Sequence, residues 1–396
     1  MKKATRQQTK EHNRNLVLKT IFEHPSVSRA EIGRITSLTP TTVSSIVANL
    51  MTEGLVNEMG VGASIGGKPG ILLGLVDDAR YLVGLDLGQN QFSGAVLNLR
   101  GEIKTITNLP VNNRNGDYAL ALVFEIVDRL VHDEFGPLVG IGVGTPGLVN
   151  TRDGVVISAV NLDWRDLALA QLLRDRYHLP VRVLNDSQAG AMGEYAYGGG
   201  HDDEGNLVVI NVGNGIGAGI LVGGHLFQGD GGAAGEIGHV VVMQDGGLPC
   251  RCGNRGCLET VASARAVLKR AQLMASHSAD AVRASLSGEI TLNDVEQAFV
   301  AGDPSVKQIV LEAGHYMGLA ISSLVGTLNI RKIVLSGDMT RFGAPWLGAI
   351  RETMSGTALS SLTQETRVEI GQVSGNRVIM GAAALLLNDY SLLFSR

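Results

Sequence analysis

All three cysteines of the chain fall within eight positions, at Cys250, Cys252 and Cys257, and His239 lies a short distance upstream. Three thiolates and one imidazole complete a tetrahedral zinc shell and leave no coordination position for a catalytic water. The alternative is that the cysteines are ordinary small residues of a hydrophobic core. Core packing gives no reason to crowd them between glycines, so the spacing predicts a structural zinc held by these four residues.

The sequence around these ligands resembles the signature of a known family. Gly-Glu-Ile-Gly-His at 235–239 is followed by Cys-x-Cys-Gly-x-x-Gly-Cys at 250–257. This pair of runs is similar to the ROK family, which contains bacterial sugar kinases and sugar-responsive repressors. The resemblance implies an α/β protein whose body has a two-lobed, actin-like sugar-binding fold of the ribonuclease H-like and hexokinase-like kind. It leaves open whether this chain acts on sugar or on DNA.

Length and composition set wide bounds. A chain of 396 residues with 44% hydrophobic and 18% charged residues is long enough for about two or three domains, each with its own core. Its 52 glycines suit the tight turns of an α/β fold. No apolar run is long enough to suggest a membrane span, and the basic N-terminus lacks the apolar segment of a secretory signal. With three unpaired thiols, a reduced cytoplasm is the expected compartment.

Charge is distributed unevenly. Residues 1–70 hold nine Lys and Arg against five Glu, a net charge of +4, which leaves −9 for the rest of a chain whose net charge is −5. A basic segment on an acidic body predicts that only this segment meets a polyanion. A net charge of this size is also compatible with a solvated surface, so the local pattern has to decide.

The first two helices of this basic segment are marked by their ends. One apolar face, Val17, Leu18, Ile21 and Phe22, predicts a first helix that ends near His24-Pro25, because the residue before proline disfavours helix. Ser28-Arg-Ala-Glu31 is a capping box and predicts a second, short helix through Ile35. A turn follows at residues 36–38.

A third helix follows the turn, with Thr39 as its cap and Pro40 at its first position. Its inner face has the spacing i, i+3, i+4, i+7 at Val43, Ile46, Val47 and Leu50. The small polar residues Thr41, Thr42, Ser44, Ser45 and Asn49 are left facing outward. A short helix, a tight turn and a hydroxyl-rich helix predict a helix-turn-helix that reads DNA through these residues and Thr39. The alternative is a three-helix module that docks a protein.

A β-wing is predicted after the third helix. Residues 56–59 and 71–75 have the pattern of two strands, and the glycine-rich loop between them carries Lys68 as a candidate phosphate or minor-groove contact. The same loop has an equally good explanation as a linker turn. The segment from Arg14 through Pro69 resembles the winged helix of ROK repressors, especially those of the xylose type, and the kinases of the family lack it.

Three segments correspond to the ATP-binding elements of the family's kinases. After Asp86-Leu-Gly88 the kinases continue Gly-Thr-Lys, where this chain has Gln89, Asn90 and Gln91. The second element, residues 213–219, keeps its glycines but has Asn214 in place of Thr, and glycines there also suit a tight β-turn. The third, residues 334–338, lacks the usual glycine run. Two of the three elements are degraded, so efficient phosphoryl transfer is not expected.

The sugar side of the site is better preserved. A buried strand at 181–184 delivers Asn185 and Asp186 at its carboxyl end, where α/β sheets place ligands. An Asn-Asp pair after a strand is also a common helix cap. By resemblance, Asp186 corresponds to the general base of the kinases and Asn185 to a hydroxyl ligand, while Glu236, His239 and Glu259 complete the ring of sugar ligands. His239 then serves both zinc and sugar.

The segment Asn161-Leu-Asp163-Trp164-Arg165 resembles the family's cleft mouth, and Trp164 has an equally good explanation as a core anchor. We expect a winged helix-turn-helix domain with an N-terminal arm at 1–77, a first lobe at 78–198 plus 380–396, and a second lobe at 199–379. The second lobe is expected to hold the zinc site and an inserted helical region.

The leading hypothesis is a sugar-responsive repressor of carbohydrate genes, whose partners are operator DNA and a small sugar such as xylose, glucose or an amino sugar. A homodimer, or a dimer of dimers, suits a palindromic operator. The alternative is an ATP-dependent sugar kinase with an added DNA-binding domain. The retained Asp186 favours this alternative. Regulation by a protein partner is a third possibility.

Overall fold

The computed structural model describes residues 5–62, 69–131, 135–199, 205–277, 290–373, 375–387 and 393. The chain forms two compact units. Unit 1 comprises residues 1–146, 151–183 and 382–396, and unit 2 comprises residues 147–150 and 184–381.

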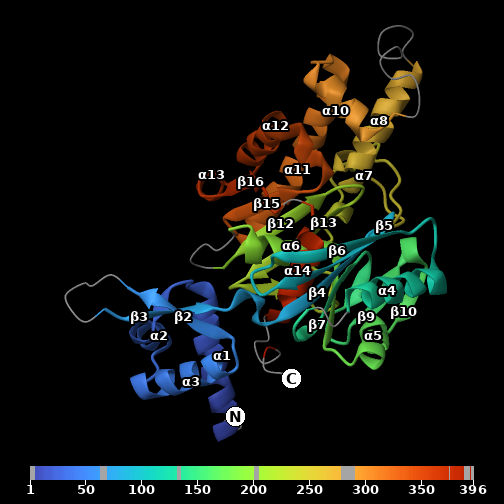
Figure 1. Cartoon of the computed structure of the whole chain (residues 1–396). Helices are drawn as coiled ribbons and strands as arrows, with labels where there is room; N and C mark the ends of the chain where they lie inside the picture. Colours follow the sequence, from blue (N-terminus) through green and yellow to red (C-terminus); the bar gives the residue numbers. More distant parts are fainter. Residues whose placement is uncertain are drawn as a thin grey trace. The chain divides into compact units, whose positions relative to one another are not determined.

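Unit 1 begins with three helices and a small antiparallel sheet of strand order β1-β3-β2, the arrangement of a winged helix-turn-helix (Figure 1). The elements are α1 (Arg6–Glu23), β1 (Val27–Ser28), α2 (Arg29–Thr36), α3 (Pro40–Thr52), β2 (Val56–Val61) and β3 (Ile71–Leu75). The three predicted helices and both predicted wing strands are confirmed, with α2 one residue longer than expected and β2 two residues longer.

The predicted caps explain where these helices begin. The Ser28 hydroxyl accepts a hydrogen bond from the Glu31 backbone, and the Glu31 carboxylate accepts one from the Ser28 backbone at 2.9 Å. The Thr39 hydroxyl accepts one from the backbone of Thr42 at 3.2 Å. Ser37, in the left-handed region at φ 56°, turns the chain between α2 and α3. The apolar face predicted for α3 is buried.

The rest of unit 1 is built on a five-stranded sheet of order β11-β7-β4-β5-β6. Strand β4 pairs antiparallel with β5 and parallel with β7. The strands are β4 (Tyr81–Leu87), β5 (Gln91–Asn98), β6 (Ile103–Pro110), β7 (Leu138–Thr145) and β11 (Val181–Asn185). The accompanying elements are η1 (Asp77–Ala79), α4 (Gly116–Leu130), β9 (Val155–Ala159), η2 (Val160–Leu162), β10 (Trp164–Leu167) and α5 (Leu169–Tyr177).

The last helix, α14 (Arg377–Leu387), returns to this sheet. A Cβ atom on Gly142 of β7 would lie 1.9 Å from the carbonyl oxygen of Ala382, so only glycine permits the approach of helix to strand. The part of α14 from Ala382 onward belongs to unit 1 and packs on this sheet.

Unit 2 contains a second five-stranded sheet, of order β14-β13-β12-β15-β16. Its strands are β12 (Leu207–Val212), β13 (Ile216–Val222), β14 (His225–Phe227), β15 (Lys332–Ser336) and β16 (Arg367–Ile370). Its other elements are β8 (Leu148–Asn150), α6 (Asp186–Tyr197), η3 (Ile237–His239), α7 (Glu259–Ala262), α8 (Ala264–His277), α10 (Leu292–Val300), α11 (Pro304–Leu328), η4 (Asp338–Phe342), α12 (Gly343–Thr357) and α13 (Ser360–Thr363).

The two sheets share one topology, although no repeat is visible in the sequence. In both, the first strand in chain order, β4 or β12, pairs antiparallel with the second and parallel with the fourth. In both, the strands follow the order 3-2-1-4-5 when numbered along the chain. Two such sheets in one chain are typical of the actin-like, ribonuclease H-like architecture, and the predicted α/β fold class is confirmed.

Helix α6 packs on the second sheet, whereas the sequence-based division placed it with the first lobe by ending that lobe at residue 198. Small residues explain the packing. A Cβ atom on Gly217 would lie 2.4 Å from the Ser187 hydroxyl, and one on Gly219 would lie 2.2 Å from the Ala191 methyl group. Two glycines on β13 therefore let α6 lie close against the strand. The predicted domain boundaries otherwise stay a prediction.

Helix α11 is, by length and composition, apolar enough to cross a membrane, whereas we expected no apolar run long enough for a membrane span. Its Val310, Ala313 and Met317 have no exposed surface and lie in the hydrophobic core of unit 2. Gly314 and Gly318 pack against α12, where added Cβ atoms would lie 3.0 Å or less from atoms of Ala349 and Thr353. These contacts are those of a core helix.

Candidate functional site

The predicted site residues Asn185 and Asp186 lie at the junction of β11 and α6. The Asn185 side-chain oxygen accepts hydrogen bonds from the backbone of Ser187 at 2.9 Å and of Gln188 at 3.4 Å, and its amide group donates to the carbonyl of Gly147 at 2.9 Å. Asn185 is therefore the N-cap of α6, which confirms the capping alternative for this residue.

Asp186 occupies the first helical position. Its carboxylate accepts hydrogen bonds from the backbone of Ser187 at 2.6 Å and from the Ser187 hydroxyl at 3.2 Å. Burial raises the pKa of the Asp186 carboxyl, whereas the Ser187 hydrogen bonds and the nearby Arg377 guanidinium act in the opposite direction. A carboxyl group at the end of a strand whose charged form is disfavoured by burial is typical of a functional site.

A second acidic group of the site is Glu236, which directly precedes η3. Partial burial raises the pKa of the Glu236 carboxyl. His239 lowers that pKa, and the negative charges of Asp186 and Glu259 add to the rise. The His239 Nε2 atom lies 3.9 Å from the Glu236 carboxylate. The structure therefore brings together the residues predicted to bind sugar, all of them in unit 2.

Glu259 joins this acidic group to the cysteines. It opens α7 and is 8% exposed, its carboxylate accepts a hydrogen bond from the Cys250 thiol at 3.2 Å, and it lies 3.7 Å from the Arg265 guanidinium. Its other carboxylate oxygen would lie 3.3 Å from a Cβ atom on Gly215. Glycine at 215 thus leaves room for the carboxylate between the hairpin and the cysteine loop.

The predicted metal ligands form one cluster. The ligand atoms of His239, Cys250, Cys252 and Cys257 all lie within 4.8 Å of one another, so the group could hold a metal ion. The His239 Nδ1 atom lies 3.5 Å from the Cys250 sulfur, and the sulfurs of Cys252 and Cys257 are 3.7 Å apart. Cys257 is completely buried and Cys252 is exposed.

The backbone of the cysteine loop explains its glycines. The Cys250 amide donates to the Asn254 carbonyl at 2.8 Å, which closes a tight turn. A hydrogen bond from the Asn254 backbone lowers the pKa of Cys252 to about 7, whereas burial raises that of Cys250 to about 12. Gly256 has φ +73°, and a Cβ atom there would lie 1.8 Å from the Met243 carbonyl oxygen. The turn and the glycine let the loop bring the three cysteines close together.

A carboxylate, that of Asp338, lies beside the glycine hairpin between β12 and β13. A Cβ atom on Gly213 would lie 3.4 Å from the carboxylate of Asp338, and Asn214 is exposed at the tip. A carboxylate beside the hairpin opposes a bound phosphate. In unit 1 the corresponding loop exposes Gln89, Asn90 and Gln91.

In the predicted cleft-mouth segment, residues 161–165, the tryptophan packs in the core. Trp164 is 5% exposed, and its indole N–H donates to the Gly116 carbonyl at 3.0 Å. The core-anchor alternative is confirmed for this residue. Asp163 next to it is exposed and adopts the left-handed conformation at φ 53°.

Two residues of the site were missed by the sequence reasoning. Gln188, 2% exposed, donates through Nε2 to the Gly232 carbonyl at 2.9 Å, and its Oε1 has no partner among the described residues. It thereby ties the first turn of α6 to the glycine loop before Glu236. Arg377 lies near Asp186 and donates to the Asn211 side chain at 2.5 Å. The contacts of both residues span distant parts of the chain, so no local signal marks them.

Apart from Lys68, the residues predicted to contact DNA lie on or next to α3. Thr39, Thr41, Ser44, Ser45 and Asn49 are exposed, and Thr42 is half-buried with its hydroxyl 2.9 Å from that of Thr39. Lys68 lies outside the described residues. Arg34, near the end of α2, was not predicted, and its side chain is 76% exposed.

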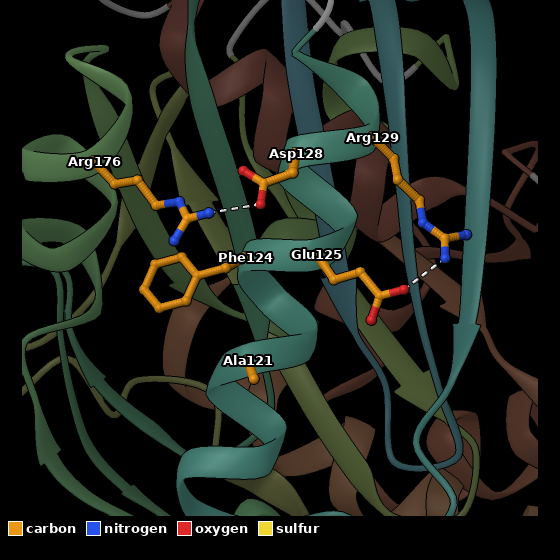
Figure 2. Close-up of a pocket in the computed structure, with 6 residues that line it drawn as sticks. All are labelled: Ala121, Phe124, Glu125, Asp128, Arg129 and Arg176. Atoms are coloured by element: carbon orange, nitrogen blue, oxygen red, sulfur yellow. Dashed lines mark hydrogen bonds and ion pairs between the residues drawn. The ribbon is translucent and has the colours of Figure 1, made fainter.

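Figure 2 shows a surface hollow on α4 and α5 that is distinct from these sites. The guanidinium of Arg176 stacks 4.9 Å from the Phe124 ring centre and lies 2.7 Å from the Asp128 carboxylate. Arg129 pairs with Glu125 at 2.5 Å. The charged side chains that line this hollow are paired with one another, and we assign it no role.

Comparisons place the chain among known proteins. A family model described as the ROK family matches residues 82–389. A xylose repressor of Caldicellulosiruptor bescii is 31% identical over 390 residues, 96% of each chain. A glucokinase of Halalkalibacterium halodurans is 33% identical over 314 residues, 78% of this chain and 95% of the kinase.

A solved structure agrees with this assignment. The crystal structure of a ROK family transcriptional regulator, a homologue of the Escherichia coli MLC protein, matches 98% of both chains with a TM-score of 0.86 and 28% identity. With the match of the family model over most of the chain, the conclusion is direct: the chain belongs to the ROK family.

Proposed function

We propose that the protein is a sugar-responsive, DNA-binding transcriptional repressor of carbohydrate-utilisation genes. The observation that carries this proposal is the presence in one chain of a capped α3 with an exposed hydroxyl face and of a group of sugar-ligand-type residues in unit 2. The similarity to a xylose repressor along 96% of both chains supports it.

The sugar would bind at Asn185, Asp186, Glu236, His239 and Glu259. Carboxylates accept hydrogen bonds from hydroxyl groups, and an amide offers both donors and acceptors, which suits a polyol. The Asn185 amide already caps α6, so its contact with a sugar would use its remaining hydrogen-bonding capacity. Xylose, glucose and amino sugars are the candidate effectors.

The metal would be a structural Zn²⁺. Zinc bonds of about 2.3 Å to sulfur and 2.0 Å to nitrogen in a tetrahedron place two sulfurs about 3.8 Å apart, and a sulfur and a nitrogen about 3.5 Å apart. The observed separations of 3.7 Å for Cys252 and Cys257 and 3.5 Å for Cys250 and His239 fit these values. His239 would bind the metal through Nδ1 and present Nε2 to the sugar.

Operator DNA would be read by α3, with Thr39, Thr41, Thr42, Ser44, Ser45 and Asn49 as the contacting side chains and Lys68 as a wing contact. The Thr39 cap orders the N-terminal turn of α3, which would contact phosphate or base edges. A homodimer or a dimer of dimers would present two such helices to a palindromic site. In this proposal the predicted domain of residues 1–77 contacts the DNA, and we call it the reading head.

The kinase alternative is less favourable. Exposed Gln89, Asn90 and Gln91 stand where the family's kinases carry a Gly-Thr-Lys run, and Asp338 lies beside the glycine hairpin. The Halalkalibacterium glucokinase matches 78% of this chain, which leaves about the length of the reading head unmatched. We therefore propose a non-enzymatic role, with Asp186 as a sugar ligand.

The test is fluorescence-anisotropy binding of the zinc-replete protein to DNA from upstream of its own gene, at stated salt, with and without a panel of pentoses, hexoses and amino sugars. Specific binding that one sugar releases is the expected result. Binding that no sugar alters would contradict the sugar response, and ATP-dependent sugar turnover that disappears in Asp186→Ala would support the kinase.

A further inference from the structure

The connection between β3 and β4, residues 76–80, is held on both sides by hydrogen bonds. After β3 the chain passes through Val76 and η1 into β4. The Val76 amide donates to the Leu55 carbonyl of the head at 2.9 Å, and the Asp77 carbonyl accepts from the Leu99 amide at 3.0 Å. Leu99 belongs to the turn between β5 and β6, so this turn contacts the connection directly.

Arg100 in the same turn reaches the head itself. Its guanidinium donates from Nη1 to the carbonyl oxygen of Phe22 at 2.7 Å, and its Cζ atom lies 4.9 Å from the centre of the Phe22 ring. Its Nε atom lies 3.1 Å from the Asp77 carboxylate. The Arg100 side chain is 29% exposed. Through these contacts it joins the β5–β6 turn to the β3–β4 connection and to the end of α1.

These contacts use the specific chemistry of arginine. The Phe22 carbonyl is in the last turn of α1, where the helix macrodipole favours a cation. Stacking on an aromatic ring adds a cation–π interaction. A lysine would retain the charge but not the planar group that donates, stacks and pairs at once.

Helix α1 is firmly packed within the head, so a contact at its end can fix the orientation of the head. Val17, Leu18 and Ile21 of α1 have no exposed surface, and α1 packs on α2, α3 and β3. The β5–β6 turn is equally well fixed, because β5 pairs with β4 over residues 92–98 and with β6 on its other side. The contacts of Arg100 therefore link two firmly packed parts of unit 1, this hairpin and the helix that packs on α3.

We propose that Arg100 is a positioning residue that couples the body of the protein to its DNA-reading head. It fixes the orientation of α1, and so of α3, relative to the β5–β6 hairpin. Removing its side chain leaves the sugar site and the reading surface intact and weakens the transmission between them. This inference rests on the proposed sugar-responsive function.

The experiment measures operator affinity with and without saturating effector sugar for the wild type, Arg100→Ala and Arg100→Lys. Arg129→Ala is the matched control, because it removes the same charge from a 52% exposed arginine elsewhere in unit 1. The quantity of interest is the ratio of operator Kd with sugar to operator Kd without sugar. Sugar affinity in the absence of DNA is measured for each protein.

The expected result is a ratio lowered by at least about fivefold in Arg100→Ala, the low end of ordinary coupling between sites. Arg100→Lys should lie between wild type and Arg100→Ala, and Arg129→Ala should match the wild type. Sugar affinity should be the same in all four proteins. A merely structural role for Arg100 would change melting temperature or both affinities without changing the ratio.

An unchanged ratio in both Arg100 variants would overturn the proposal. Hydrogen exchange gives a second measurement that does not depend on sugar, since the amide of His24, bonded to Thr20, should exchange faster in Arg100→Ala if Arg100 fixes the end of α1. An unchanged exchange rate there would also count against it. A wild type whose operator affinity no sugar alters would instead refute the proposed function, which separates the two failures.

Discussion

His239 belongs to the cluster of candidate metal ligands and also lies next to the acidic group of the site. Its Nδ1 atom faces the Cys250 sulfur at 3.5 Å, and its Nε2 atom lies 3.9 Å from the Glu236 carboxylate. A metal bound at Nδ1 would fix the plane of the ring and the tautomer at Nε2. The sugar side of the imidazole would therefore be only as well ordered as the cysteine cluster.

We therefore expect Cys257→Ser to impair sugar binding as well as metal binding. The variant should lose most of its bound zinc and bind sugar about 10–100-fold more weakly, because His239 is no longer held. Metal analysis and calorimetric sugar titration measure the two effects. Arg251→Ala in the same loop is the control and should retain both properties, and tight sugar binding by the zinc-depleted serine variant would contradict the link.

We expect the negative charge of Asp186 to lower the stability of the fold while it strengthens sugar binding. Burial raises the pKa of its carboxyl, so the folded state takes up a proton more readily than the unfolded state. The charged form then costs stability at neutral pH, and this cost diminishes as the pH falls toward the raised pKa. Asp186→Asn removes the charge and keeps the acceptor for the Ser187 hydrogen bonds.

The expected result for Asp186→Asn at pH 7 is a protein about 1 kcal/mol more stable than the wild type, a gain typical of replacing a strained functional residue. Sugar binding should be weaker by about tenfold or more, since a hydrogen bond to a charged group is lost. Thermal unfolding from pH 7 downward should show the stability difference shrinking. A variant less stable than the wild type at pH 7 would refute the argument.

At the scale of elements, the helices of the reading head begin at residues whose side chains cap them. Thr39 caps α3 and Ser28 caps α2 through local hydrogen bonds. Thr39 was also predicted to contact DNA, so its two roles have to be separated. Thr41, two positions later and exposed, has no part in the cap interactions of Thr39.

Thr39→Ala and Thr41→Ala form a matched pair that separates the cap from DNA contact. We expect Thr39→Ala to destabilise the head by about 1 kcal/mol, the usual effect of losing a cap, and to weaken operator binding. Thr41→Ala should weaken operator binding without a change in stability. Circular dichroism melts and operator titrations measure both quantities, and equal stability of the two variants would show that the cap is unimportant.

At the scale of the whole molecule, a sugar that weakens operator binding must itself be bound more weakly when operator is present. This reciprocity follows from thermodynamic linkage, whatever the structural route. We expect both factors to be equal and about 5–150-fold. Sugar titrations with and without saturating operator, at one salt concentration, test it. Unequal factors would mean that sugar and DNA act on different oligomeric states.

Local features of the fold were predictable from the sequence because they depend on residues a few positions apart. The capping box at Ser28–Glu31, the apolar face of α3 and the cluster of three cysteines all appear at short spacing, and the structure has the helices and the cluster where they were expected. The division between the lobes near α6 was less accessible, since α6 follows β11 directly in sequence yet packs on β13.

The sequence by itself therefore determined the helices of the head, the candidate metal ligands and, through family resemblance, the identity of the sugar-ligand candidates. Only the tertiary structure decided that Trp164 serves the core, that Gln188 and Arg377 support the site, and that Arg100 reaches α1. The physical reason is range. Caps and helical periodicity are set within a few residues, whereas these contacts join residues 44 to 166 positions apart, and only the packing of the sheets brings them together.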